Sequence, residues 1–186
     1  INDKGIKLSK QIAKEAFELG QLPLIEFGLS ELYNACKYTE ILTYEAYNNI
    51  GTLKGAVIKY ADKLYDSFTD EEKKIFANLL SAVITISDKD EMIFVRKTTL
   101  RKNIERDAIH KKLLDKLIDS HLFISGKDSC GEATITIVHE MLIHSWTVVK
   151  EWCQSQISFL KQNDYYEKQA RYWMANNKSD KSLIQE

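Results

Sequence analysis

The sequence predicts a mainly α-helical protein with a small β-hairpin in its second half. Only one proline and seven glycines interrupt the 186 residues, so few positions break a helix. Apolar residues recur at helical spacing through most of the chain. Within residues 122–138 they instead alternate with polar residues, as in half-buried strands.

The first two predicted helices flank Gly20. The first covers about residues 6–19, and the second begins at Leu22 with Pro23 in its first turn. A proline in the first helical turn lacks only an N–H that has no helical partner there. Pro23 is therefore compatible with a helix start.

Two further helices complete a predicted N-terminal bundle, residues 1–68. Thr43 is expected to cap a short helix over residues 44–49 that stops at Gly51, because a threonine hydroxyl accepts a free N–H at a helix start. The next helix runs over residues 53–68.

A second unit begins at a capping box, Thr69 to Glu72, which opens a helix with an apolar face. Asp88–Asp90 marks a turn, and Met92–Val95 is predicted to be a short strand. Thr98 or Thr99 then caps a brief helix near residues 100–104.

An amphipathic helix follows Asp107, and a β-hairpin follows that helix. The predicted strands are residues 122–125 and 133–138, with a polar turn between them. Three helices followed by a two-stranded wing is the order of a winged-helix domain, which we place at residues 69–162. A connector helix and a polar tail take up residues 163–186.

The second strand runs directly into a helix that is predicted to open with His139 and Glu140. Unsatisfied N–H groups at a helix start form a natural anion site, and their dipole disfavours imidazolium. A bound phosphate would restore the charged form through a hydrogen bond of about 1.5–3 kcal/mol. The pattern alone leaves two interpretations of His139, an anion contact or the more common capping or solvent-facing residue, and Glu140 is interpreted as a first-turn carboxylate.

Composition excludes several classes of function. The net charge of -1 gives no general attraction to nucleic acid or to anionic membranes. Three scattered cysteines show neither zinc nor disulfide spacing, so we expect a reducing, cytoplasmic location. No apolar run reaches membrane-spanning length, and no signal peptide precedes the first helix. Because the chain starts at Ile1 without methionine, we expect it to be part of a longer protein.

Catalytic and metal chemistry are also disfavoured. The HEMLIH segment resembles a zincin motif, but His139 and His144 are five residues apart and project from different helix faces. His110 and His121 are interpreted as helix-surface residues, and Cys153 as core packing. No phosphate-binding G-x-x-x-x-G-K-[ST] loop occurs, so the chain alone is not expected to hydrolyse ATP.

Four segments carry a family resemblance: LPLIEFGLSELY, LTYEAYNNIGTLKGAVIKYADKLYDSF, LLDKLIDSHLFI and VHEMLIHSWTVVKEW. They lie within residues 22–152, and the resemblance extends to about residue 173. The chain resembles the STAND class of signal-transduction ATPases, in the bacterial branch that is related to NB-ARC proteins and often fused to WD-type repeats. The resemblance implies that residues 1–68 form an AAA+-type, ARC1-like lid and residues 69–162 an ARC2-like winged helix.

The resemblance also implies two nucleotide contacts. In this class a Gly-x-Pro motif places a proline near the adenine. Gly20 and Pro23 depart from that spacing by one residue, which leaves Pro23 as the residue to carry over. A histidine in a Met-His-Asp signature contacts the β-phosphate of ADP, and Val138-His139-Glu140 corresponds to it here.

The implied cofactor is ADP or ATP, held by a P-loop domain that is absent from this chain. The implied partners are that domain, a C-terminal repeat or sensor domain of the same polypeptide, and further copies upon activation. No metal is implied.

Two other functions stay open. A winged helix can bind nucleic acid through its third helix, but here the lysines of DAIHKKLLDKLIDS are balanced by aspartates. A basic cluster is the main evidence for that function: Arg96, Lys97, Arg101, Lys102 and Arg106. Alternatively, the aromatic C-terminal helices could form a protein-interaction surface.

Overall fold

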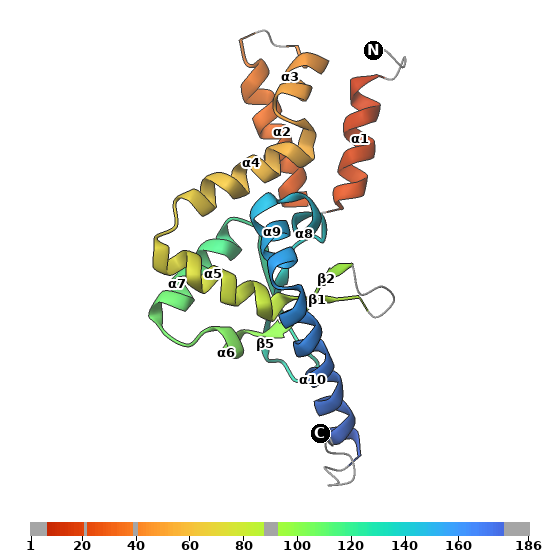
Figure 1. The fold of residues 1–186 in the computed structure, drawn as a ribbon. Helices are drawn as coiled ribbons and strands as arrows, with labels where there is room; N and C mark the ends of the chain where they lie inside the picture. Colours follow the sequence, from red (N-terminus) through yellow and green to blue (C-terminus); the bar gives the residue numbers. More distant parts are fainter. Residues whose placement is uncertain (1–6, 21, 39–40, 88–92, 177–186) are drawn as a thin grey trace.

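The computed structural model describes residues 7–20, 22–38, 41–87 and 93–176, and it is mainly helical, as predicted. Figure 1 shows helices α1 to α4 gathered at one end and helix α10 projecting from the opposite end. We call α1–α4 the N-terminal bundle and α5–α10, with their strands, the C-terminal unit. In the described part of the chain, no helix is both long and apolar enough to cross a membrane.

The N-terminal bundle contains the four predicted helices. They are α1 (Leu8–Leu19), α2 (Leu22–Cys36), α3 (Tyr44–Asn49) and α4 (Thr52–Asp66). Thr43 caps α3 as predicted, because its hydroxyl accepts from the Ala46 N–H at 3.1 Å. Helices α2 and α4 approach closely at Gly28, where a Cβ would lie 2.8 Å from the Leu53 Cδ2 atom.

The sequence did not reveal how α4 begins. The Glu15 carboxylate of α1 accepts from the Thr52 hydroxyl at 2.5 Å, the Lys54 N–H at 3.2 Å and the Leu53 N–H at 3.4 Å. The hydroxyl of Tyr47, a fully buried residue, also donates to Glu15. One carboxylate thus satisfies the helix start and joins α1, α3 and α4.

The C-terminal unit starts with α5 (Asp70–Val83) and its predicted capping box: Thr69 accepts from the Glu72 N–H, and the Glu72 carboxylate accepts from the Thr69 N–H. Strand β1 (Ile84–Ile86), which was not predicted, follows α5 directly and pairs antiparallel with β2 (Phe94–Arg96).

The strand was predicted at Met92–Val95. In the described residues it covers Phe94–Arg96, so it ends one residue later than predicted. The turn predicted at Asp88–Asp90, and Met92 itself, lie outside the described residues.

The predicted threonine cap before residue 101 is wrong. Thr99 and Leu100 form strand β3, which pairs with Ile135 and Thr134, and helix α6 (Arg101–Ile104) has no side-chain cap. Because the helix begins only at Arg101, the residue at the cap position is Leu100, whose apolar side chain cannot accept an N–H. The next helix, α7 (Ala108–Asp119), begins as predicted at Asp107, whose carboxylate accepts two backbone N–H groups.

The predicted hairpin is present as β4 (Phe123–Lys127) and β5 (Ala133–Ile137). With β3 it forms a three-stranded sheet of order β3-β5-β4. Helices α8 (Met141–Ser145), α9 (Thr147–Ser155) and α10 (Ile157–Ala175) complete the unit. The tail from residue 177 onward lies outside the described residues.

One hydrophobic core joins the bundle to the C-terminal unit, with Leu24, Val57 and Ala61 on one side and Trp146 on the other. Trp146 is 1% exposed, and its indole N–H donates to the Asp62 carboxylate of α4 at 2.8 Å. Its ring centroid lies 5.6 Å from that of Phe76 and 6.4 Å from that of Tyr65. The domain boundaries at residues 68 and 162 stay predictions.

We predict that Asp62→Ala lowers the free energy of unfolding by about 1–3 kcal/mol, because it leaves the buried Trp146 N–H without an acceptor. Urea unfolding followed by tryptophan fluorescence measures the change. Asp66→Ala, at an exposed site of the same helix, is the matched control. An equal effect of the two substitutions would contradict the role of this hydrogen bond.

Candidate functional site

His139 lies in the turn between β5 and α8, not inside the helix as predicted. Strand β5 ends at Ile137 and α8 begins at Met141, with Glu140 as the residue before the helix. The imidazole Nδ1 accepts a hydrogen bond from the Met141 N–H at 3.0 Å. His139 therefore acts as an acceptor for the helix start, and a neutral ring in this arrangement carries its proton on Nε2.

The surroundings of His139 favour the neutral ring. Burial lowers its pKa from the usual 6.5, and the positive charge of Arg96 lowers it further. The Glu140 charge and a hydrogen bond with the Glu18 backbone act in the opposite direction, while Lys54 adds a smaller lowering effect. Elements from both parts of the molecule thus influence this one side chain.

Arg96, the last residue of β2, holds the backbone just before His139. Its Nη1 group donates to the Val138 carbonyl at 2.9 Å and to the Ile137 carbonyl at 3.4 Å. The Val138 N–H in turn donates to the Leu122 carbonyl at 3.0 Å. Both backbone polar groups of Val138, the residue before His139, are therefore held by hydrogen bonds.

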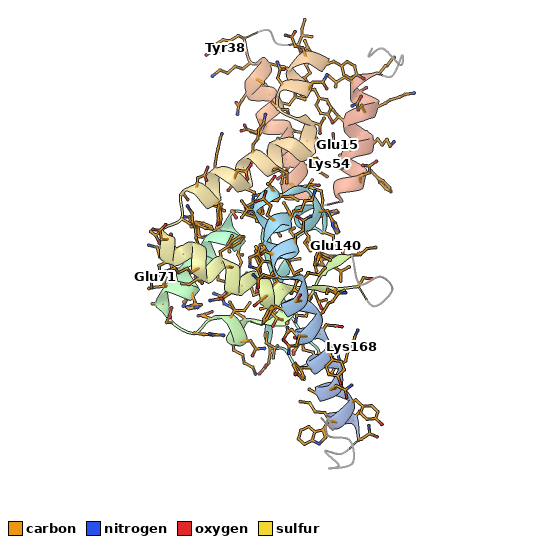
Figure 2. The ribbon with its side chains drawn as sticks, viewed as in Figure 1. Glu15, Tyr38, Lys54, Glu71, Glu140 and Lys168 are labelled. Atoms are coloured by element: carbon orange, nitrogen blue, oxygen red, sulfur yellow. The ribbon has the colours of Figure 1, made fainter. Side chains whose placement is uncertain are left out.

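Lys54 comes from the first turn of α4, where Figure 2 shows it beside Glu15. Its ammonium group lies 2.8 Å from the Glu18 carboxylate, and this hydrogen bond and charge lower the Glu18 pKa. The pair is largely exposed, so it contributes little to stability. It leaves a positive group close to the end of α1.

Pro23 is the second residue of α2, which agrees with the predicted place in the first turn. The left-handed backbone of Gly20, with φ of 61°, ends the preceding helix. The side chain of Pro23 lies outside the described part of the structure. Its contact with an adenine stays a prediction.

The other histidines and Cys153, which were predicted to have no role in binding, lie outside this site. His110 lies on α7 and pairs with Asp107 at 2.8 Å, whereas His121 lies in the turn after α7 with φ of 58°, so its predicted helical placement is wrong. Cys153 is buried in the core as predicted, and burial raises its pKa to about 12.

Most of the basic cluster is engaged by acids. Lys97 pairs with Glu167, and Lys102 pairs with Glu132. Arg101 pairs with both Glu105 and Asp115. These contacts reduce the positive charge that this surface offers to phosphate.

The described groups around His139 include hydrogen-bond donors of the kind that suit an anion. A neutral imidazole N–H and the cations of Arg96 and Lys54 provide hydrogen-bond donors. Sequence spacing identified His139 but gave no signal for Lys54, and it placed Arg96 only in a general basic cluster. In the described residues, no group of three or more acids, histidines and cysteines could hold a metal ion.

A family model described as Novel STAND NTPase 1 matches residues 4–181. No curated protein and no solved structure shows a significant match to the chain.

We predict that His139 makes stability pH-dependent. Because its pKa is lowered in the folded state, the unfolded chain binds the proton first as the pH falls below about 6.5. The stabilisation is complete above that pH and is lost as the pH falls through the lowered pKa. The urea midpoint should therefore fall more for the wild type than for His139→Asn between pH 7 and pH 5.5. An equal fall of the urea midpoint in the wild type and in His139→Asn over this pH range would contradict the prediction.

Proposed function

Because the chain belongs to the Novel STAND NTPase 1 family, we propose that it is the regulatory lid and winged-helix part of a nucleotide-dependent switch. In this proposal the N-terminal bundle is the lid and the C-terminal unit contains the winged helix. The observation that carries it is the position of His139, between the end of the β-sheet and the start of α8, with groups from the bundle close to it.

The order of elements supports the winged-helix assignment. Helices α5, α6 and α7 precede the β4–β5 hairpin, and β3 adds a third strand to it. Three helices with a small antiparallel sheet are the parts that such a domain needs. The fold itself does not decide between a nucleic-acid interface and a switch.

The donor set around His139 fits the diphosphate of ADP. An imidazole N–H and the nearby charges of Arg96 and Lys54 suit a phosphate group, and a phosphate would stabilise the charged form of His139. When bound, ADP would supply phosphate oxygens as acceptors for these donors. We propose that His139 contacts its β-phosphate and that Pro23 lies near its adenine, with the remaining contacts made by a P-loop domain of the same polypeptide.

The mechanism in this proposal is conformational. Contact between His139 and the diphosphate holds the winged helix against the nucleotide-binding domain, which is the closed state. Loss of that contact when ATP replaces ADP releases the winged helix and permits oligomerisation. A hydrogen bond of about 1.5–3 kcal/mol shifts such an equilibrium roughly ten- to a hundredfold, which is enough for a switch.

We further propose that α10 contacts the repeat or sensor domain that follows in the polypeptide. Its exposed aromatic residues support this assignment, because Tyr165, Tyr166 and Tyr172 are each about half exposed.

We predict that the 186-residue chain alone shows no ADP binding by isothermal titration calorimetry at micromolar concentrations. The residues that we propose for nucleotide contact supply few of the interactions that tight binding needs, because the P-loop that would hold the phosphates is not in the sequence. Micromolar affinity would contradict the assignment of the chain as a lid and winged helix.

In a longer protein that includes the P-loop domain, His139→Ala should accelerate ADP release by roughly tenfold or more, the scale of one charge-assisted hydrogen bond. Stopped-flow displacement of a fluorescent ADP analogue measures the release rate. His144→Ala is the matched control, since His144 lies exposed on α8. An unchanged release rate for His139→Ala would remove this residue from the switch.

A further inference from the structure

We infer that Arg96 is a second phosphate-binding group of the His139 site: its guanidinium holds the Ile137–Val138 backbone with one nitrogen and offers its other N–H groups to the same phosphate. This inference rests on the proposed function and adds a residue that neither the sequence pattern nor the resemblance assigned.

The first step in the argument is position. Arg96 donates through Nη1 to the carbonyl of Val138, the residue directly before His139, at 2.9 Å. The same nitrogen reaches the Ile137 carbonyl at 3.4 Å. The guanidinium therefore lies against the turn that carries the imidazole, although Arg96 and Val138 are 42 residues apart.

The second step is the number of donors. A guanidinium has five N–H groups in a planar fork, and the contacts with described residues use Nη1. Arg96 is an exposed residue, so we infer that its Nε and Nη2 groups can reach a ligand. A fork with one nitrogen anchored and others accessible is suited to phosphate oxygens.

The third step is charge. Arg96 has no acidic partner among the described residues, whereas Lys54 is paired with Glu18. The two acids that line the same groove as Arg96 have other partners: Asp164 pairs with Lys168, and Glu167 with Lys97. Arg96 is thus a positive charge beside this turn that no acid of the described residues neutralises. Its charge also lowers the pKa of His139.

The test uses inorganic pyrophosphate at millimolar concentrations, with NMR detection of the His139 ring in the 186-residue chain. In the wild type, pyrophosphate should shift the His139 ring signals and raise the His139 pKa. Arg96→Gln should weaken pyrophosphate binding by about fivefold, the scale of one exposed ion pair. Arg96→Lys should retain part of the affinity, because it keeps the charge but not the fork.

Two controls separate phosphate binding from a structural role. Arg106→Gln removes an exposed arginine elsewhere and should leave pyrophosphate binding unchanged. Without ligand, Arg96→Gln should raise the His139 pKa, whereas Arg96→Lys should not. Lys54 and Glu140, whose charges also act on His139, are unchanged in the wild type, in Arg96→Gln and in Arg96→Lys.

Equal pyrophosphate affinity of the wild type and Arg96→Gln would overturn the inference, and so would an absence of any pyrophosphate effect on His139. Neither result would decide the proposed function, because ADP release from the longer protein tests His139 separately. Conversely, an unchanged release rate in His139→Ala would reject the proposed switch even if Arg96 bound pyrophosphate.

Discussion

The rest of the structure depends on the packing of Trp146 against helix α4. This side chain is buried among Tyr65, Phe76 and the apolar residues of α4, and its single polar atom is satisfied by Asp62. The contact places α8 and α9 against the N-terminal bundle. Because His139 lies two residues before α8, the same contact helps to determine where the imidazole lies relative to α1 and α4. The position of the candidate site therefore depends on the packing of the core around Trp146.

A second common theme is the use of distant side chains at helix starts. Glu15 satisfies the start of α4 from another helix, and His139 satisfies the start of α8 through Nδ1. The first group joins elements of the bundle, because Tyr47 of α3 and Thr52 and Lys54 of α4 all donate to the same carboxylate. The second can exchange its proton and its partners, which suits it to respond to an anion. Both side chains thus accept N–H groups at a helix start. The Glu15 contact connects helices, whereas the His139 contact can change with protonation.

The sequence predicted what depends on neighbouring residues. The caps at Thr43 and Thr69 and the hairpin are local, and they appear where the pattern placed them. The three-residue strand β1 was missed because it continues the apolar run of α5 without a break. The contacts of Glu15 with Lys54 and of Arg96 with Val138 join residues 39 and 42 positions apart, and no spacing rule reports such pairs. His139 was found because a strand-to-helix junction is visible in the sequence, but its exact relation to the helix required coordinates.

Helix α10 is long and extends away from the rest of the molecule. It is a single helix of 19 residues, so it is about 28 Å long. Leu160, near its start, is its one fully buried described residue, and Figure 1 shows the helix extending beyond the body. If the body turns by about 10°, the far end of a rod of this length travels about 5 Å. The helix would therefore act as a lever arm, because a small rotation of the body would produce a larger displacement at the far end of α10.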